Sequence, residues 1–263
     1  MLFSACRRSP DLRDGGVDVA YPDVGVCSVG LRTMTIPSPA TYGRLGTLAV
    51  RSWTGYELTQ QVRRSLRFVW PVSEGHLYRE QKRLIDLGWA TVEREPAGRR
   101  TRNRFSITEP GRAALADWLA TEPEEPHFQV EGVLRTFFGD QGKRDDLVTS
   151  MHTTAEMARS MLEEMLGFVE EYLEEGGPLS MLEAQPDRGA AHRVEFPGRP
   201  MFPERLHVVA LAIDVTTRLL KTLDDFFTES SQEVAAWSSA PDNALTPATR
   251  ARLKQIRSRR PAR

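Results

Sequence analysis

Residues 73–119 read SEGHLYREQKRLIDLGWATVEREPAGRRTRNRFSITEPGRAALADWL and decide the fold. Ser73 is a favoured N-cap residue and Gly88 a common helix stop, so together they predict a helix between them. Residues 89–95 and 103–108 then alternate between apolar and polar side chains, as strands do, and enclose a tip rich in arginine. Another helix follows the second strand, since proline is tolerated in a first turn. The stretch therefore predicts a helix, a β-hairpin and a further helix.

The preceding residues, 45–58, read LGTLAVRSWTGYEL and predict two more helices. A short apolar helix comes first and ends at a break. Thr54 and Glu57 then fit a capping box, in which the Thr54 hydroxyl accepts from the Glu57 amide and the Glu57 carboxylate reaches back. The helix that this box begins is expected over residues 55–66, with an apolar residue at every fourth position. Three helices, a two-stranded wing and a fourth helix are the order of a winged helix-turn-helix.

The helix that begins at Ser73 is the candidate DNA-contacting element. It has a narrow apolar stripe, and its other faces carry basic and aromatic side chains that suit a polyanion. Taken alone, the tip arginines would fit a solvated turn equally well, but the basic helix beside them favours contact with phosphates. We expect base-edge contacts from the helix and phosphate contacts from the wing. The predicted DNA-binding residues are Ser73, His76, Tyr78, Arg79, Lys82, Arg83, Arg99, Arg100 and Arg102.

Three aromatic residues near this helix, Trp53, Tyr56 and Trp70, are expected to pack in the core or between domains. Base stacking is the alternative role, but double-stranded DNA exposes few base faces.

The ordered motifs of residues 45–119 resemble the N-terminal domain of the PadR family of transcriptional regulators. The resemblance is carried by Gly55-Tyr56-Glu57, by Tyr78 with Lys82-Arg83-Leu84 and Gly88, and by Ile107-Thr108 followed by Gly111. The chain departs from the family at Arg79 and Gln81, where the family usually has proline and leucine. Arg79 adds a cation to the expected DNA face, whereas Gln81 brings a polar group into the packing of that turn. The resemblance implies a DNA-binding transcriptional regulator that acts as a repressor.

Two long helices are predicted in the second half of the chain. Apolar residues recur at spacings of three and four over 148–172 and over 206–227, as in a coiled-coil seam. Further apolar residues flank each seam, so helices of the same chain or of a second copy must cover the remaining width. The resemblance implies that these helices join two protomers into a homodimer, with 133–139 as the link between the two halves. The predicted dimerisation residues are Met151, Ala158, Leu162, Met165, Val169, Tyr172, Leu206, Val209, Ile213, Leu220, Leu223 and Phe227.

Four aromatic residues, Trp118, Phe128, Phe137 and Phe138, cluster in sequence between the fourth helix and the long helices. They either pack the two halves together or line a pocket for a small planar or apolar effector. Both alternatives stay open at this point.

Charge is distributed unevenly along the chain. The net charge is -1, but residues 42–118 carry 14 basic and 8 acidic side chains, 119–233 carry 10 and 23, and 234–263 carry 7 and 1. A basic module, an acidic module and a basic tail therefore share one chain.

The predicted organisation follows from this division and from the periodic patterns. Residues 1–41 form a disordered leader in which Met34 is an alternative start, and 42–120 form the winged helix-turn-helix. Residues 127–236 form the helical dimerisation and effector domain, whose internal segment 176–202 is too long for an ordinary bundle connection and is either functional or mobile. Residues 237–263 form a flexible basic tail, either a solvated end or a source of nonspecific attraction to phosphates.

Several function classes are excluded by the sequence. No apolar run approaches the roughly 20 residues of a membrane span, so we expect a cytoplasmic protein without a membrane partner. Cys6 and Cys27 precede any periodic pattern, and we interpret them as bystander thiols. His152 and Glu156 could share a helical face, but no third ligand accompanies them. Catalytic and nucleotide-binding motifs are absent, so no enzyme activity, cofactor or metal is expected.

The predicted fold class is mainly α with a small β-hairpin wing, comprising an N-terminal winged helix-turn-helix and a C-terminal long-helix dimerisation domain. The predicted function is that of a homodimeric transcriptional regulator, a repressor by resemblance, which binds a pseudo-palindromic operator on double-stranded DNA. The alternative is a winged-helix dimer that serves as a protein-interaction module without specific DNA binding.

Overall fold

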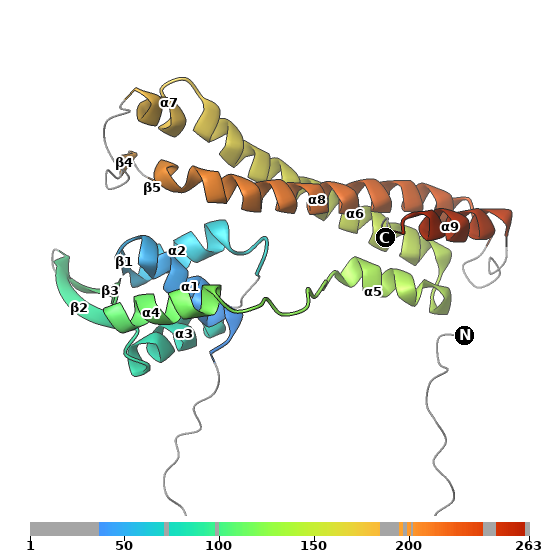
Figure 1. Ribbon diagram of the computed structural model, residues 1–263. Coiled ribbons are helices and arrows are strands. Elements are labelled where there is room, and N and C mark those ends of the chain that lie inside the picture. Colours follow the sequence, from blue (N-terminus) through green and yellow to red (C-terminus); the bar gives the residue numbers. More distant parts are fainter. Residues whose placement is uncertain are drawn as a thin grey trace, which may run out of the picture. The chain divides into compact units, whose positions relative to one another are not determined.

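The computed structural model describes residues 37–70, 74–97, 100–184, 195–196, 199–200, 202–238 and 246–260. Within these ranges the chain is mostly helical, with a three-stranded and a two-stranded antiparallel sheet (Figure 1). The predicted leader up to residue 36, with Met34 and both cysteines, lies outside the described residues, as do Ser73 and Arg99. No helix in the described part of the chain has the length and apolar character needed to cross a membrane.

The first part of the fold is a winged helix. Its helices are α1 (Pro39–Val50), α2 (Gly55–Ser65), α3 (Glu74–Asp86) and α4 (Glu109–Leu119). Its sheet contains β1 (Trp53–Thr54), β2 (Ala90–Ala97) and β3 (Arg100–Ile107) in the antiparallel order β1-β3-β2. Helix α1 contacts each of the other three helices as well as β3, so it lies at the centre of the domain. The predicted order of helices and wing is confirmed.

The local signals for helix ends act as expected. Thr54 Oγ1 accepts from the Glu57 amide at 3.3 Å, and Glu57 Oε2 accepts from the Thr54 amide at 2.8 Å, which completes the capping box of α2. Gly88, just after α3, has a positive φ of 70°, a conformation that glycine adopts without strain. Gly111 in α4 approaches the sheet so closely that a Cβ there would lie 2.2 Å from the Trp89 carbonyl oxygen.

Three expectations about the winged helix are wrong. The sheet has a third strand, β1, in the break after α1, because Trp53 and Thr54 pair with Phe105 and Arg104 of β3. Tyr56 and Trp70 were expected to pack in the core or between domains, but 76% of the Tyr56 surface and 46% of the Trp70 surface are exposed. Tyr56 lies two residues before Leu58, and two residues of helix place side chains on nearly opposite faces. Trp53, in contrast, is buried and donates its indole N–H to the Thr47 carbonyl at 2.8 Å.

The second part of the fold is built on two long antiparallel helices. Helices α6 (Arg144–Leu173) and α8 (Leu206–Ala235) lie side by side (Figure 1). The short elements around them are α5 (Glu131–Phe137), η1 (Gly139–Gln141), α7 (Pro178–Glu183), β4 (Glu195–Phe196), β5 (Arg199–Pro200) and η2 (Pro203–Arg205). The two helices predicted from the seams are therefore present, and each is longer than its seam.

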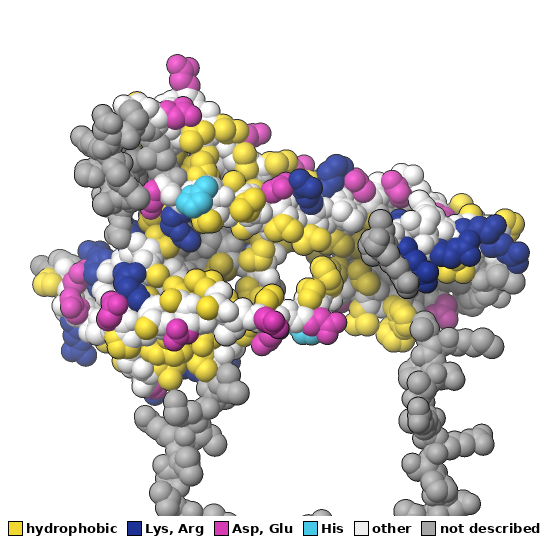
Figure 2. Space-filling view, viewed as in Figure 1, with side chains coloured by type: hydrophobic (Ala, Val, Ile, Leu, Met, Phe, Trp, Pro, Cys, Tyr) yellow, Lys and Arg dark blue, Asp and Glu magenta, His cyan; other side chains and the backbone are white. Residues whose placement is uncertain are grey.

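The C-terminal tail also contains a helix, α9 (Pro247–Ser258), where a flexible end was expected. Thr246 caps it by accepting from the Thr249 amide at 3.2 Å, and Pro247 occupies the first helical position. Figure 2 shows the basic side chains gathered over this helix. A short capped helix with few large apolar residues has too weak a hydrophobic period to stand out in the sequence.

Candidate nucleic-acid interface

Helix α3 separates a buried face from an exposed one. Glu80, Gln81 and Leu84 are buried against the domain, whereas Arg79 and Lys82 are exposed. Residues three apart in a helix are neighbours on its surface, so the two cations form one patch. Arg83 is half-buried, with Nη1 4.0 Å from Glu80 Oε1. The side chains of His76 and Tyr78 lie outside the described residues.

A buried polar cluster fixes α3 on α1. Glu80 Oε2 accepts from Thr41 Oγ1 at 2.5 Å. Burial lowers the pKa of the Arg44 guanidinium to about 10, and the nearby negative charge of Glu80 opposes that shift. The cluster therefore holds a charged helix face against the core through opposite charges and a hydrogen bond, which orients Arg79 and Lys82 outward.

Gln81 is the point at which this packing is imperfect. Its side chain is buried, and Nε2 has no hydrogen-bond partner among the described residues. A buried amide without a partner costs about 1–3 kcal/mol. Gln81, where the family that this chain resembles usually has leucine, therefore lowers the stability of the packing around α3.

The wing presents one described arginine of the predicted set. Glu95 of β2 lies opposite Arg102 of β3, and Arg102 Nε is 3.5 Å from Glu95 Oε2. The same carboxylate accepts from Arg104 Nε at 2.5 Å, and this bond holds the pKa of Glu95 below its ordinary value. Arg102 is exposed despite its partner. The side chain of Arg100 lies outside the described residues.

Two residues of the wing were missed by the sequence interpretation. Arg104 orders the carboxylate beside Arg102, and Arg94 is exposed on β2. The antiparallel register would have indicated the Glu95 pairing, because the alternation pattern places it on the same face as Arg102 and Arg104. The described interface therefore contains six exposed or half-buried cations, three on α3 and three on the wing, and two of them, Arg102 and Arg104, share the Glu95 carboxylate. This composition suits contact with phosphates.

A cavity of about 230 Å³ lies in the winged helix, between α1 and α2. Arg44 of α1, Val62 of α2, Trp70 and Trp118 are among its lining residues. The Trp118 ring stacks on Tyr42, with ring centres 4.8 Å apart and planes within 4° of parallel. An apolar wall with two indoles and one buried guanidinium suits a small planar molecule.

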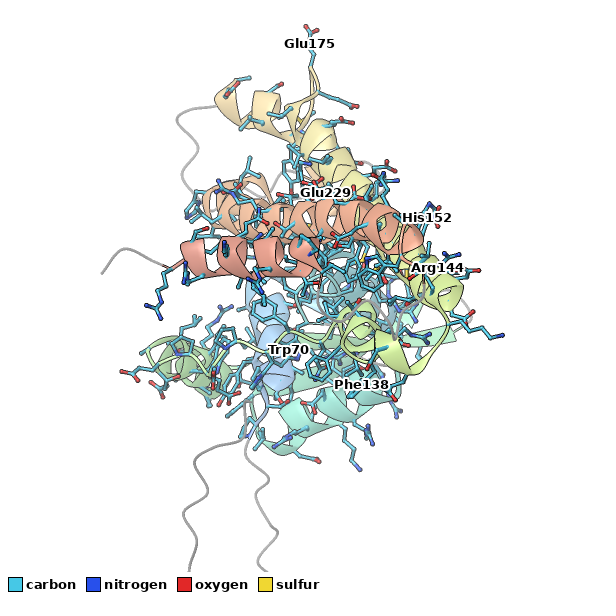
Figure 3. All side chains as sticks on the ribbon, turned by 90° about the vertical axis from the view of Figure 1, so that its right-hand side faces the viewer. Trp70, Phe138, Arg144, His152, Glu175 and Glu229 are labelled. Atoms are coloured by element: carbon cyan, nitrogen blue, oxygen red, sulfur yellow. The ribbon has the colours of Figure 1, made fainter. Side chains whose placement is uncertain are left out.

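Only one of the four predicted effector residues lines this cavity. The other three, Phe128, Phe137 and Phe138, are exposed. The rings of Phe137 and Phe138 meet edge to face, with their centres 5.0 Å apart. Trp70 and Phe138, both labelled in Figure 3, come from different segments: Trp70 from the turn after α2, and Phe138 from the end of α5. The four predicted effector residues, which are close in sequence, therefore do not line one cavity.

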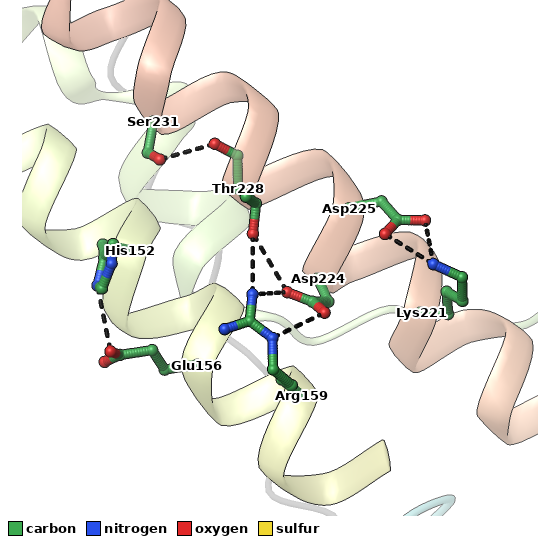
Figure 4. A network of polar contacts seen from close by, with 8 residues as sticks. All are labelled: His152, Glu156, Arg159, Lys221, Asp224, Asp225, Thr228 and Ser231. Carbon is green, nitrogen blue, oxygen red and sulfur yellow. Dashed lines mark hydrogen bonds and ion pairs between the residues drawn. The ribbon is translucent and has the colours of Figure 1, made fainter. Parts of the chain in front are cut away.

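The predicted dimerisation residues lie on α6 and α8, and three of them, Met151, Leu223 and Phe227, belong to a hydrophobic cluster that joins the two helices of one chain. Five are buried, namely Met151, Ala158, Met165, Leu220 and Phe227. The other seven are half-buried, namely Leu162, Val169, Tyr172, Leu206, Val209, Ile213 and Leu223. Across the seam, Arg159 makes two bonds to the Asp224 carboxylate, at 2.6 and 3.1 Å (Figure 4). The Arg159–Asp224 pair and the cluster around Met151 and Phe227 therefore join α6 to α8 within one protomer.

A second apolar stripe on α8 is exposed. Its members, spaced by four, four and seven residues, are Leu211, Val215, Leu219 and Phe226. These spacings place all four on one face of the helix. This exposed face, which we call the α8 stripe, is separate from the buried residues Leu220 and Phe227 of the same helix.

The described residues contain no group of three or more histidine, cysteine, aspartate or glutamate side chains that could hold a metal ion. His152 Nδ1 lies 3.4 Å from Glu156 Oε1 on the exposed face of α6 (Figure 4).

Comparison with known proteins places this arrangement in context. Residues 45–117 match the model of the family described as "Transcriptional regulator PadR-like family". The negative transcriptional regulator PadR of Bacillus subtilis (strain 168) is 24% identical over 150 residues, which cover 56% of this chain and 81% of that protein.

Two solved structures share the fold. The crystal structure of Bacillus subtilis PadR in complex with operator DNA matches with a TM-score of 0.55 and 17% identity, covering 74% of this chain and 98% of that one. The structure of the same protein in complex with p-coumaric acid gives a TM-score of 0.50 at 17% identity, with the same coverage.

Proposed function

We propose that this chain, whose residues 45–117 match the PadR-like family of transcriptional regulators, acts as a homodimeric repressor. The match of these residues supports a regulator and not an enzyme. Its target would be a pseudo-palindromic operator, because a two-fold dimer presents two identical reading helices.

The observation that carries the proposal is the exposed face of α3. Arg79 and Lys82 lie on it side by side, while Glu80, Gln81 and Leu84 hold the opposite face in the core. Arginine and lysine are the side chains that most often read guanine in the major groove. The related Bacillus subtilis PadR has been solved with operator DNA, which supports the same use of the fold here.

The α8 stripe supports the dimer. Four large apolar side chains on one exposed helix face are unusual unless another surface covers them. A two-fold dimer would bring the same stripe of two copies together, and it would set two α3 helices about one turn of DNA, roughly 34–36 Å, apart.

The experiment is a protection and competition assay on the DNA upstream of the gene itself. We expect a protected segment with two-fold sequence symmetry, which survives an excess of unrelated competitor DNA and weakens as salt rises. Competitor DNA that removes all binding would contradict the repressor proposal and would favour the protein-interaction module instead.

We also propose that the cavity beside Trp118 binds the effector. The structure of the related PadR with p-coumaric acid supports a small planar ligand, and the two indoles and the apolar wall would accept one. Such a ligand releases DNA only if it binds one dimer geometry better than another.

A cavity-filling variant tests this effector site. Ala40 lines the cavity, so Ala40→Leu should remove the space a ligand needs while DNA affinity stays within about twofold. With p-coumaric acid and other planar compounds as probes, we expect wild-type protein at saturating ligand to gain about 2–4 °C in Tm per kcal/mol of binding. The variant should show neither this gain nor ligand-induced release from DNA.

Phe138→Ala is the matched control, since Phe138 does not line the cavity. It should keep the response of the wild type. If Ala40→Leu keeps the response to ligand and Phe138→Ala loses it, the effector binds at the exposed pair of Phe137 and Phe138 instead.

A further inference from the structure

Helix α9 and the residues that follow it form a strongly basic surface. Residues 246–260 contain six lysine and arginine side chains and no aspartate or glutamate. No residue of α9 is buried. Figure 2 shows these cations as a dark blue group over the helix, exposed to solvent.

Within the described part of the chain, one of the six cations forms an ion pair. Arg252 pairs with Glu233 of α8, and none of the other five pairs with a described residue. Elsewhere in the C-terminal half, cations on long helices are paired, as Arg218 is with Asp214 and Lys221 with Asp225. The cations of α9 therefore do little to neutralise the acidic half beside them in sequence.

One face of α9 is linked to α8, and another face carries a row of cations. Arg252 links α9 to α8, while Arg250, Lys254 and Arg257, at spacings of four and three, share another face. This row extends over about 10 Å at 1.5 Å per residue. A DNA duplex carries one negative charge per about 1.7 Å, so the row can neutralise several phosphates at once.

We propose that α9 is a second DNA contact of this regulator, one that binds phosphates without reading sequence. The inference rests on the proposed function, because it needs the chain to be on DNA. Basic, exposed helices without carboxylates are typical of nucleic-acid contact. A membrane surface suits α9 less well, because Leu253 and Ile256 are its only large apolar side chains, whereas interfacial helices bury a wide apolar face.

The test compares two charge-matched variants. The α9 variant replaces Arg250, Lys254 and Arg257 with glutamine. The control variant replaces Arg135, Lys143 and Arg218, three described cations outside both α9 and the winged helix, in the same way. Both variants lose three positive charges per chain, so any general effect of net charge is shared.

Binding is measured by fluorescence anisotropy from about 50 to 300 mM KCl, on an operator duplex with flanking DNA and on a scrambled duplex of equal length. We expect the negative slope of log K against log salt to become shallower by about 1–3 units per protomer in the α9 variant. In the control variant the slope should stay unchanged. Affinity for the two duplexes should fall by the same factor, so the operator-to-scrambled ratio should be preserved.

Equal slopes for the α9 variant and the control variant would overturn the proposal, provided both melt at the temperature of the wild type. A change in the operator-to-scrambled ratio would overturn it too, since a phosphate contact carries no sequence information. If the α9 variant loses the wild type's binding to vesicles of anionic lipid while its salt slope on DNA equals that of the wild type, α9 contacts membranes and not DNA. If the wild type fails to prefer the operator, the proposed function fails, while the slopes on the scrambled duplex still decide the role of α9.

Discussion

The double variant Arg79→Ala, Lys82→Ala is expected to lose most operator binding while it keeps its fold. Each side chain is exposed on α3, so its removal leaves the core intact. A base-reading cation contributes about 1–3 kcal/mol, which corresponds to about 5- to 150-fold in affinity for each residue. The two neighbours can share a contact, so the combined loss need not be the full product.

The measurement is a titration of operator and scrambled duplexes at one fixed salt concentration. The double variant should approach the scrambled affinity on both duplexes. A control with two other exposed cations, Arg135→Ala and Lys143→Ala, should keep the preference of the wild type. Full operator affinity in the double variant would show that α3 does not read this operator.

Adjacent leucines of α8 are expected to give opposite outcomes when each is changed to aspartate. Leu220 is 6% exposed in the seam with α6, so Leu220→Asp would bury a charge at a cost of several kcal/mol and should give unfolded or insoluble protein. Leu219 is 47% exposed on the α8 stripe, so Leu219→Asp should leave the helices folded but separate the two protomers.

Analytical ultracentrifugation at micromolar concentration and far-ultraviolet circular dichroism distinguish these outcomes. The wild type should sediment as a dimer, and Leu219→Asp as a monomer with native helix content. A dimeric Leu219→Asp would move the interface away from the α8 stripe, and a monomeric wild type would refute the homodimer.

Local signals made much of the fold predictable. The Thr54 capping box, the stop at Gly88 and the seams of the long helices each depend on residues close in sequence, and the structure contains all of them. Strand β1 could not be predicted, because two residues have no measurable period and pair with β3 only through the tertiary fold.

Contacts between residues far apart in the sequence were harder to predict. Spacings of three and four identify a seam, but they do not say whether the partner helix belongs to the same chain, and here α6 and α8 fill each other's seam. Trp118 shows the same limit, since its neighbours in space are α1 and α2 rather than the phenylalanines near it in sequence. On α3, the helical period did separate exposed Arg79 and Lys82 from buried Leu84.

The carboxylate of Glu95 gives the wing a built-in competitor for phosphate. Its Oε2 lies 3.5 Å from Arg102 Nε, which leaves the other N–H groups of that guanidinium for a phosphate. If the wing meets DNA as proposed and Arg102 turns to a phosphate, Arg104 still holds Glu95 at 2.5 Å, so the carboxylate keeps a positive neighbour. An exposed ion pair contributes only about 0–1 kcal/mol, so this exchange would weaken the attraction of the wing to DNA only slightly.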